Sequence, residues 1–600
     1  MSSDPPHGRG RANSSSTPPV ELRGIPGSAG FAIGPAIIVG ARRAGLVLRR
    51  IPKHLADEEV ARFEAAVATA SAELREVAEK LGGDAPRAEV SILEAYVLMV
   101  GDPSLHEDVE RRVRIDRQCA EWALDSAARE MSMQLQGSSD AYLAERSHDI
   151  EFVADCILKA LSGKRPSLSI PDGDEPGVLI ARDLSPAETV SLDRHRVLAI
   201  VTERGTRSSH TAILARALEI PAVVGAGEVL GRIAHGDRIV VDGLHGRVTI
   251  NPSPVALEEA ERRARRYREM AQGLRQLKDR PATTRCGTRI VLKANIELEG
   301  EAAIALEQGA EGVGLYRTEF LYLNRASQPG EEEQYQTYRR VVEALAPLPV
   351  TMRTFDLGGD KLAFALPIPP GHNPALGFRA VRLGLELPEL MLTQLRAMVR
   401  ASAHGNLQIM IPMVASLTEL FRVRQLLEQA IAEIDARAQA RAERVELGTM
   451  IEVPSAAILA DHFATHSDFM SIGTNDLVQY TLAVDRTSRE LARLASDLDP
   501  AVLQLLKGVI QAGKLKGRPV VVCGAMASDP LSAVVLVGMG LRELSLEASS
   551  LPEVKEALSR VTLEEAEDVA RLGLAAQTAD EVETLVAERF APRLADLLEP

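Results

Sequence analysis

Cysteine is scarce in this sequence: the 600 residues contain only four. Their positions, 119, 156, 286 and 523, form no Cys-x-x-Cys pair, so the sequence predicts neither a zinc site nor a disulfide framework. Long apolar runs are also missing. No run reaches the length of about 20 residues that a transmembrane helix needs, and the first residues lack the apolar core of a signal peptide. We therefore expect a cytoplasmic protein that makes no membrane contact.

Basic residues are outnumbered: 69 Lys and Arg stand against 84 Asp and Glu, for a net charge of -15. Binding to a nucleic-acid backbone needs a basic face, so this balance argues against a nucleic-acid partner. It is compatible with a basic protein partner, although a solvated acidic surface explains it as simply. A chain of 600 residues is too long for one core, and about 100–200 residues per domain predicts three or four units.

The first half of the chain changes its pattern twice. Residues 1–20 are rich in Pro, Ser and Gly, and we expect a disordered tail. Residues 46–165 follow helical spacing in four segments, which predicts a four-helix unit. The expected segments are 56–83, 87–100, 103–136 and 139–161.

Short strands flank this helical unit on both sides. Residues 21–45 and 166–254 contain runs such as "FAIGPAIIVG", "RVLAIVT" and "DRIVVDG", with one helix over about 211–218. They predict one compact α/β domain, interrupted by the helical insert. Residues 255–281 are charged and helical in pattern, and we interpret them as a linker helix.

Residues 282–600 alternate strand and helix patterns. The eight expected strands are "RIVLKAN", "EGVGLY", "VTMRTF", "QIMIPM", "LGTMIE", "DFMSIG", "PVVVCG" and "ELSLEA". Eight strand–helix units in about 300 residues predict a TIM (β/α)₈ barrel. An open doubly wound sheet is the alternative, and the count of eight together with the position of the polar residues favours the barrel.

Polar side chains follow several of these strands at the end where barrel enzymes hold their chemistry. They are Arg317, Arg353, Glu452, Asn475, Asp476 and Cys523. Arginine forks bind carboxylate and phosphate groups, and paired carboxylates suit Mg²⁺. The set predicts a small, doubly anionic, phosphorylated substrate. Taken singly, each residue has a structural explanation, such as a surface ion pair for an arginine or an inert buried thiol for the cysteine.

A second candidate site lies in "GTRSSHTAILAR", where His210 begins a helical pattern. The partial positive charge of a helix N-terminus keeps an imidazole neutral and therefore nucleophilic. Free N–H groups at such a terminus also hold phosphate. His210 is thus a candidate phosphate carrier, and a capping or packing histidine is the alternative.

Several long motifs resemble Enzyme I of the bacterial sugar phosphotransferase system, the phosphoenolpyruvate–protein phosphotransferases. The matching stretches are "GTRSSHTAILARALEIPAVVG", "EGVGLYRTEFL", "RTFDLGGDK", "NPALGFRAVR", "MIEVP" and "FMSIGTNDLVQYTLAVDR". The resemblance runs from about residue 24 nearly to the C-terminus. It implies transfer of phosphate from phosphoenolpyruvate (PEP) to a histidine and then to the carrier protein HPr, with release of pyruvate.

The resemblance also implies an architecture. It comprises a PEP-binding barrel, a swivelling phosphohistidine domain with hinges near 166–170 and 253–257, and an inserted HPr-binding helical domain. Family members dimerise through the barrel, so a homodimer is implied.

Roles for individual residues follow only from their match to the family. The resemblance implies His210 as the phosphorylated nucleophile and Cys523 as the acid that protonates the leaving enolate. It implies Mg²⁺ bound by Glu452 and Asp476. The substrate-binding residues implied are Arg317, Arg353, Asn475, Asp476 and Arg486. Thr189, Arg216 and Arg379 lie in matching segments.

One departure from the family stands at the strand-seven corner. The usual Cys-Gly-Glu is here Cys523-Gly524-Ala525. Two alternative functions are less consistent with the sequence. A nucleotide-dependent PEP–pyruvate phosphotransferase needs a large nucleotide-binding domain, whereas a helical insert without a phosphate-cradling glycine loop precedes His210. A non-enzymatic PEP sensor or scaffold is disfavoured because the histidine, both carboxylates and the thiol are retained.

Overall fold

The computed structural model divides into two compact units, Met1–Tyr267 and Arg268–Pro600. The residues it describes are 20–39, 49–81, 96–97, 99–136, 150, 153–158, 160–162, 175–184, 196–205, 210–217, 220–322, 327–358, 373, 375–485, 491 and 494–598. The expected tail lies outside the described residues except for Val20, and so does the expected hinge at 166–170.

The helical part of the first unit contains α1 (Ala56–Leu81), α3 (Pro103–Arg114) and α4 (Ala120–Gln136). The sequence predicted one segment over 103–136, and that prediction was wrong. Arg117 has a φ of 60°, and the backbone N–H of Cys119 donates to the carbonyl of Arg49 at 3.1 Å. These features end α3 and turn the chain before α4 begins. Buried apolar side chains such as Phe63 and Leu124 form the core between the helices.

The α/β part of the first unit is an eight-stranded mixed sheet with the order β1-β8-β7-β3-β4-β5-β6-β2. Its strands are β1 (Val20–Arg23), β2 (Ile25–Ser28), β3 (Phe31–Ile38), β4 (Gly177–Ala181), β5 (Val197–Thr202), β6 (Ala222–Val224), β7 (Arg238–Asp242) and β8 (Arg247–Ile250). Strand β3 pairs with β4 in parallel and with β7 antiparallel. At the centre of the sheet, a strand that precedes the helical segment in sequence therefore pairs with two strands that follow it.

Two helices follow from this sheet along the chain. Helix α7 (His210–Ala217) lies between β5 and β6 in sequence. Helix α8 (Pro254–Arg275) follows β8 and corresponds to the expected linker helix. The Phe31 and Tyr267 rings meet edge-on, with centroids 5.8 Å apart, and this contact attaches the helix to the sheet.

The second unit is a closed barrel of eight parallel strands, which confirms the TIM-barrel prediction over the open sheet. The strands are β10 (Arg289–Ile296), β11 (Val313–Arg317), β12 (Pro349–Arg353), β13 (Asn406–Ile411), β14 (Glu446–Ile451), β15 (Met470–Ile472), β16 (Val520–Val522) and β17 (Glu543–Glu547). Each pairs with the next, and β10 pairs with both β17 and β11, which closes the ring. The short β9 (Ala282–Thr283) adds to β10 antiparallel.

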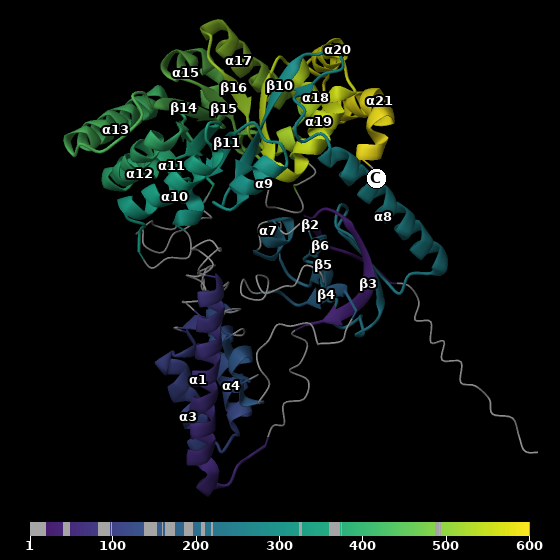
Figure 1. The fold of residues 1–600 in the computed structure, drawn as a ribbon, viewed down its shortest axis with the longest axis vertical. Helices are drawn as coiled ribbons and strands as arrows, with labels where there is room; N and C mark the ends of the chain where they lie inside the picture. The colour runs from purple at the N-terminus through teal and green to yellow at the C-terminus, as the bar shows by residue number, and fades with distance from the viewer. Residues whose placement is uncertain are drawn as a thin grey trace, which may run out of the picture. The chain divides into compact units, whose positions relative to one another are not determined.

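Helices form the outer layer of the barrel (Figure 1). They are α9 (Glu301–Glu307), α10 (Glu331–Leu345), α11 (Ala380–Glu386), α12 (Pro388–Ala401), α13 (Leu417–Ala436), α14 (Pro454–Ile458), α15 (Ala460–His466), α16 (Thr474–Leu482), α17 (Pro500–Lys516), α18 (Pro530–Gly538), α19 (Leu551–Ser559), α20 (Leu563–Gly573) and α21 (Ala579–Leu598). In the described part of the chain, no helix is both long and apolar enough to cross a membrane.

Side chains alternate between two environments along each barrel strand. On β14, Leu447 and Ile451 join the large core between strands and helices, whereas Met450 belongs to a separate cluster. That cluster, which we call the apolar floor, contains Leu315, Met410, Met450, Phe469 and Cys523. Its members lie on or beside five different strands of the ring, and they fill part of the barrel interior.

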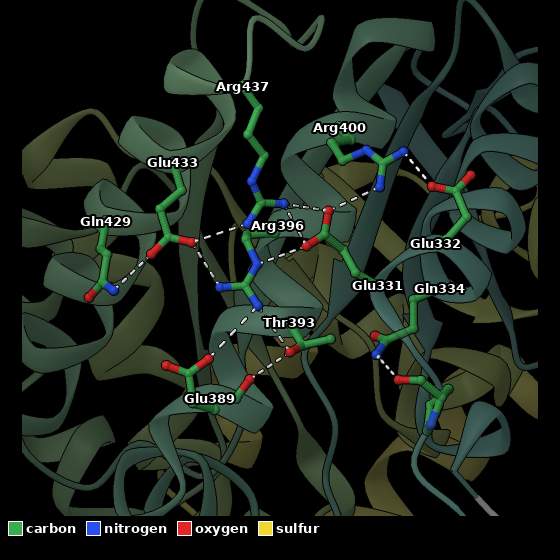
Figure 2. Close-up of polar contacts among 11 residues, drawn as sticks. Glu331, Glu332, Gln334, Glu389, Thr393, Arg396, Arg400, Gln429, Glu433 and Arg437 are labelled. Carbon is green, nitrogen blue, oxygen red and sulfur yellow. Dashed lines mark hydrogen bonds and ion pairs between the residues drawn. The ribbon is translucent and has the colours of Figure 1, made fainter.

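An ion-pair network ties helices α10, α12 and α13 together on the outside of the barrel (Figure 2). Glu331 accepts hydrogen bonds from Arg396 at 2.9 Å, Arg400 at 3.0 Å and Arg437 at 3.0 Å. Arg396 also donates to Glu433 at 2.9 Å. Burial raises the pKa of Glu331, but the three arginines outweigh it and hold the pKa below its usual range.

We predict that Glu331→Gln destabilises the barrel, because it leaves three guanidinium groups facing one another. Removing one partner of a buried ion pair costs about 3–5 kcal/mol, and partial exposure reduces this to about 1–3 kcal/mol here. The barrel transition in differential scanning calorimetry measures the effect. Glu332→Gln is the matched control: its exposed pair with Arg400 contributes under about 1 kcal/mol.

The same network predicts a pH dependence. A lowered carboxyl pKa contributes stability above the ordinary value of 4.5, and this stability is lost as the pH falls through the lowered pKa. The difference in stability between wild type and Glu331→Gln should therefore be full at pH 7 and shrink below pH 4.5. An unchanged difference at low pH would contradict the proposed role of the charge.

Candidate active site

The predicted rim residues gather at one end of the barrel because all eight strands are parallel. Arg317 and Arg353 end β11 and β12 and are register partners. Glu452 directly follows β14, and Cys523 directly follows β16. Asn475 and Asp476 lie in the first turn of α16, just after β15. Arg486 lies outside the described residues.

Arg353 is buried and held by two carboxylates that sequence reasoning did not single out. Its Nη2 lies 2.8 Å from Glu319 Oε1 and 3.6 Å from Asp356 Oδ2. Asp356 in turn accepts two hydrogen bonds from Arg379 Nη2, both at 2.9 Å. Burial lowers the pKa of Arg353, but the charges of Glu319 and Asp356 outweigh it and raise the pKa. The guanidinium therefore stays charged and fixed in orientation.

Glu452 and Asp476 form a buried carboxylate pair. Glu452 is 1% exposed, and its Oε1 accepts a hydrogen bond from the Met413 N–H at 2.6 Å. Gly473 leaves room for it, because a Cβ there would lie 2.8 Å from Glu452 Oε2. Burial, followed by the charge of Asp476, raises the pKa of Glu452, while Arg353 opposes the rise. Bringing a divalent cation to this pair would relieve the repulsion.

Buried polar atoms without a partner mark the same place. Among the described residues they include Arg317 Nε, Arg353 Nε, Thr474 Oγ1 and Asp476 Oδ1. Buried polar groups in native structures are nearly always hydrogen-bonded, so such a concentration of donors and acceptors indicates a polar ligand. The chemistry of this set, with carboxylate oxygens beside arginine donors, fits a divalent cation together with an anionic substrate.

The thiol of Cys523 sits on the apolar floor and is 3% exposed. Its Sγ lies 3.6 Å from the carbonyl oxygen of Ile472. Burial raises the pKa of Cys523 to about 11; the neighbouring Ser471 hydroxyl opposes the rise, and the charge of Glu452 adds to it. The thiol therefore keeps its proton at neutral pH. Such a group can donate a proton to a strong base formed beside it.

The corner after Cys523 is held through its backbone. The N–H of Ala525 donates to Asn475 Oδ1 at 2.8 Å, so the amide oxygen of Asn475 is used in a hydrogen bond within the protein. The amide nitrogen is the group of Asn475 that could donate to a ligand. Ala525 is exposed, so the side chain that replaces the family's usual glutamate makes no part of the buried corner.

His210 is the first residue of α7, in the unit that does not contain the barrel. Its side chain lies outside the described part of the structure, as does Thr189. The helix itself is anchored to the sheet domain. Thr211 Oγ1 donates to the Leu184 carbonyl at 3.2 Å, and Arg216 Nη1 donates to the Gly27 carbonyl at 2.9 Å. His210 and the rim residues therefore belong to different units of the structure.

One other cluster in the described residues has metal-ligating side chains, namely Glu59, Cys119 and Glu121 in the helical part. Arg62 lies 3.1 Å from Glu59 and 2.6 Å from Glu121. The guanidinium already forms an ion pair with each carboxylate. Glu59 also accepts the N–H of Ala120 at the start of α4. We interpret the cluster as an ion pair that stabilises the helical core.

Comparison with known proteins gives matches along most of the chain. Three family models match: the PEP-utilising enzyme N-terminal domain at residues 23–146, the mobile domain at 173–246 and the PEP-binding domain at 271–563. A protein named phosphoenolpyruvate-protein phosphotransferase from Bacillus sp. (strain S) is 40% identical and covers 95% of this chain and 98% of its own length. Proteins of the same name from Bacillus subtilis and Cupriavidus necator are 37% and 41% identical, covering 95% and 90% of this chain and 100% and 94% of their own lengths.

We predict that Mg²⁺ binding to the metal-free protein at pH 7 releases protons. The raised pKa of Glu452 keeps part of the population protonated, and a bound cation favours the ionised carboxylate. Affinity should accordingly increase with pH. Titration calorimetry in two buffers of different ionisation enthalpy measures the protons released.

The matched control is Glu446→Gln, which alters a glutamate at the first residue of β14, the end of the barrel opposite the rim. It should leave binding and proton release unchanged, whereas Glu452→Gln should weaken the first and abolish the second. Tight binding by Glu452→Gln would exclude this carboxylate as a ligand.

Proposed function

Because this chain belongs to the family of phosphoenolpyruvate–protein phosphotransferases, we propose that it transfers the phosphoryl group of PEP to His210 and then to a histidine of the carrier HPr, with release of pyruvate. The observation that carries the proposal is the barrel rim, where two arginines and two carboxylates meet a buried, protonated thiol. PEP has one carboxylate and one phosphate. After the phosphoryl group is transferred, the rest of the molecule leaves as the enolate of pyruvate, which needs a proton. The rim offers a partner for each group.

Arg317 and Arg353 bind and orient the anionic groups of PEP in this proposal. Their side by side position on β11 and β12 supports it, as does the fixed orientation of Arg353 between Glu319 and Asp356. Phosphoryl transfer needs positioning and charge neutralisation more than covalent chemistry from the protein. Asn475 adds its amide nitrogen, and Arg486, beyond the described residues, is proposed as a further phosphate contact.

Glu452 and Asp476 would hold Mg²⁺, which supplies charge neutralisation on the phosphate when it is bound. The unpartnered Asp476 Oδ1 and the raised pKa of Glu452 support this assignment. Cys523 would hold the proton that converts the enolate into pyruvate. Its burial and raised pKa support a role as an acid rather than as a nucleophile.

His210 would carry the phosphate between PEP and HPr. A histidine at a helix start, in a unit separate from the barrel, has to approach two different partners in turn, so we propose a swivel of the phosphohistidine domain. The helical segment is proposed as the HPr-binding part. All four cysteines are free thiols, which supports placing the reaction in the reducing cytoplasm.

The extent of the sequence match favours phosphotransfer to a carrier protein over a nucleotide-dependent enzyme. Relatives named for protein phosphotransfer align over 95% of this chain and 98% of their own length. A non-enzymatic sensor would not need a buried thiol with a raised pKa beside paired carboxylates, so the site geometry favours the enzyme.

We predict that radiolabelled PEP and Mg²⁺ label this protein with an acid-labile phosphate that passes to HPr from the same organism. His210→Ala should lose all label, because the acceptor nitrogen is gone. His235→Ala is the matched control, since His235 lies in the same sheet domain, between β6 and β7 in sequence. Gel autoradiography follows both proteins. Absence of label on well-folded wild type that binds PEP would leave only the sensor alternative.

A homodimer is proposed through exposed apolar residues on the outer layer of the barrel unit. This apolar face consists of Leu376, Phe378, Leu387, Phe421, Ile458 and Leu459, which are 36–73% exposed. Arg382 pairs with Glu419 at 2.9 Å, which joins α11 to α13, and the Phe421 ring packs edge-on against His466 of α15. Phe421 and Ile458 lie on α13 and α14, and the other four residues lie in the segments that precede or join α11, α12, α14 and α15. Exposed apolar residues on neighbouring elements are typical of an interface.

We predict that Ile458→Asp converts the dimer into monomers, because Ile458 is 73% exposed in the face and a carboxylate there would be desolvated on association. Light scattering after size exclusion measures the mass. Leu515→Asp, at a position 79% exposed on α17, is the matched control and should leave the mass unchanged. A monomeric wild type would refute the dimer.

A further inference from the structure

The corner at Cys523–Ala525 is bound to the rest of the barrel from two sides. On one side, the Cys523 N–H donates to the Ile472 carbonyl at 3.0 Å and the Ala525 N–H donates to Asn475 at 2.8 Å. On the other side, Asn295 Nδ2 donates to the carbonyl oxygen of Cys523 at 3.0 Å. Asn295 lies near the end of β10, and β17 separates β10 from β16 in the ring. Its side chain therefore reaches past a neighbouring strand to the corner.

The orientation of the Asn295 amide is set by Ser545 of β17. The Ser545 hydroxyl is fully buried and donates to Asn295 Oδ1 at 2.6 Å. An amide whose oxygen accepts that hydrogen bond must turn its nitrogen to the opposite side, toward the Cys523 carbonyl. Ser545 and Asn295 thus form a short relay that ends on the backbone of the thiol-bearing residue.

The Cys523 thiol has little of its own to fix its direction. It lies on the apolar floor, and its polar neighbours within the described structure hold it weakly: the Ile472 carbonyl oxygen lies 3.6 Å from Sγ, and the Ser471 hydroxyl is the other. Gly524 already touches α16, since a Cβ there would lie 1.9 Å from Thr474 Oγ1. The corner cannot move further toward α16, and Asn295 opposes movement away from β10.

We propose that Asn295, oriented by Ser545, is a positioning residue that fixes the Cys523 corner for proton transfer. The inference rests on the proposed function. In the step concerned, the P–O bond of PEP has broken in favour of a phosphorus–nitrogen bond to histidine, which leaves the enolate of pyruvate. The enolate oxygen forms the C=O bond, C3 takes the proton of the Cys523 S–H bond, and a thiolate remains. In reverse, that thiolate removes a proton from the methyl group of pyruvate.

The two directions of the half-reaction separate this role from a merely structural one. Forward labelling of His210 by PEP is complete before the proton moves, so it depends on the arginines and the cation. Removal of the label by added pyruvate requires the thiolate to reach the methyl group first. A misplaced thiol therefore slows the reverse direction much more than the forward one.

The variants are Asn295→Ala, the near-isosteric Asn295→Asp, which cannot donate to the Cys523 carbonyl, and Ser545→Ala. Single-turnover experiments measure labelling by PEP and removal of the label by pyruvate. We expect labelling and the KM for PEP to stay within about twofold, and removal to slow by about ten- to hundredfold in the Asn295 variants, the cost of a displacement below 1 Å. Ser545→Ala should show a smaller effect in the same direction.

Cys523→Ala shows how far removal of the label slows when the thiol is absent. Asn406→Ala, which alters an exposed asparagine at the start of β13, should have wild-type rates in both directions. Equal slowing in both directions, or a KM raised in parallel, would overturn the proposal in favour of a structural role. Wild-type rates in both Asn295 variants would also overturn it. If those variants do not fold, Ser545→Ala decides alone. A wild-type protein that takes no label from PEP contradicts the proposed function itself, before any variant is measured.

Discussion

The buried charge at the mouth of the barrel is the constraint on which the site depends. Two cations, Arg353 and Arg379, share this space with four carboxylates, those of Glu319, Asp356, Glu452 and Asp476. The third arginine of the rim, Arg317, is balanced by its ion pair with Glu297. Four negative charges against two positive charges leave an excess of two. Water cannot screen that excess where the groups are buried, so the protein has to bind a cation or hold a proton. Without a bound cation, the raised pKa of Glu452 lets this carboxyl group hold a proton instead.

The carboxylates divide the work between them. Glu319 and Asp356 are used within the protein, because their oxygens fix Arg353 and Arg379 before any ligand arrives. Asp476 keeps an unpartnered oxygen at the same mouth, beside the buried carboxyl group of Glu452. The closed ring of strands makes this division possible, since each group comes from a different strand or strand end and its place is set by packing. The ion pairs around Glu331 brace the helices outside those strands.

Much of the barrel could be predicted from the sequence, because each strand is a short apolar run and polar residues such as Arg317 and Glu452 follow directly. The contacts between side chains at the ends of these strands could not be predicted. "YRTEF" and "RTFDLGG" contain Glu319 and Asp356, but only the fold shows that both turn toward Arg353. Asn295 carried only the weak signal of a polar residue near a strand end. Helical periodicity likewise continued through Arg117, whose positive φ divides α3 from α4.

The central position of β3 has a consequence for how the chain is made. Its partners β4 and β7 are encoded more than a hundred residues later, beyond the whole helical segment. On the ribosome, the helices can pack by local contacts while β3 still lacks both neighbours. An apolar strand that waits with two open edges is an aggregation hazard. Truncation before residue 238 should therefore leave nascent chains that need a chaperone, whereas synthesis through β7 releases them.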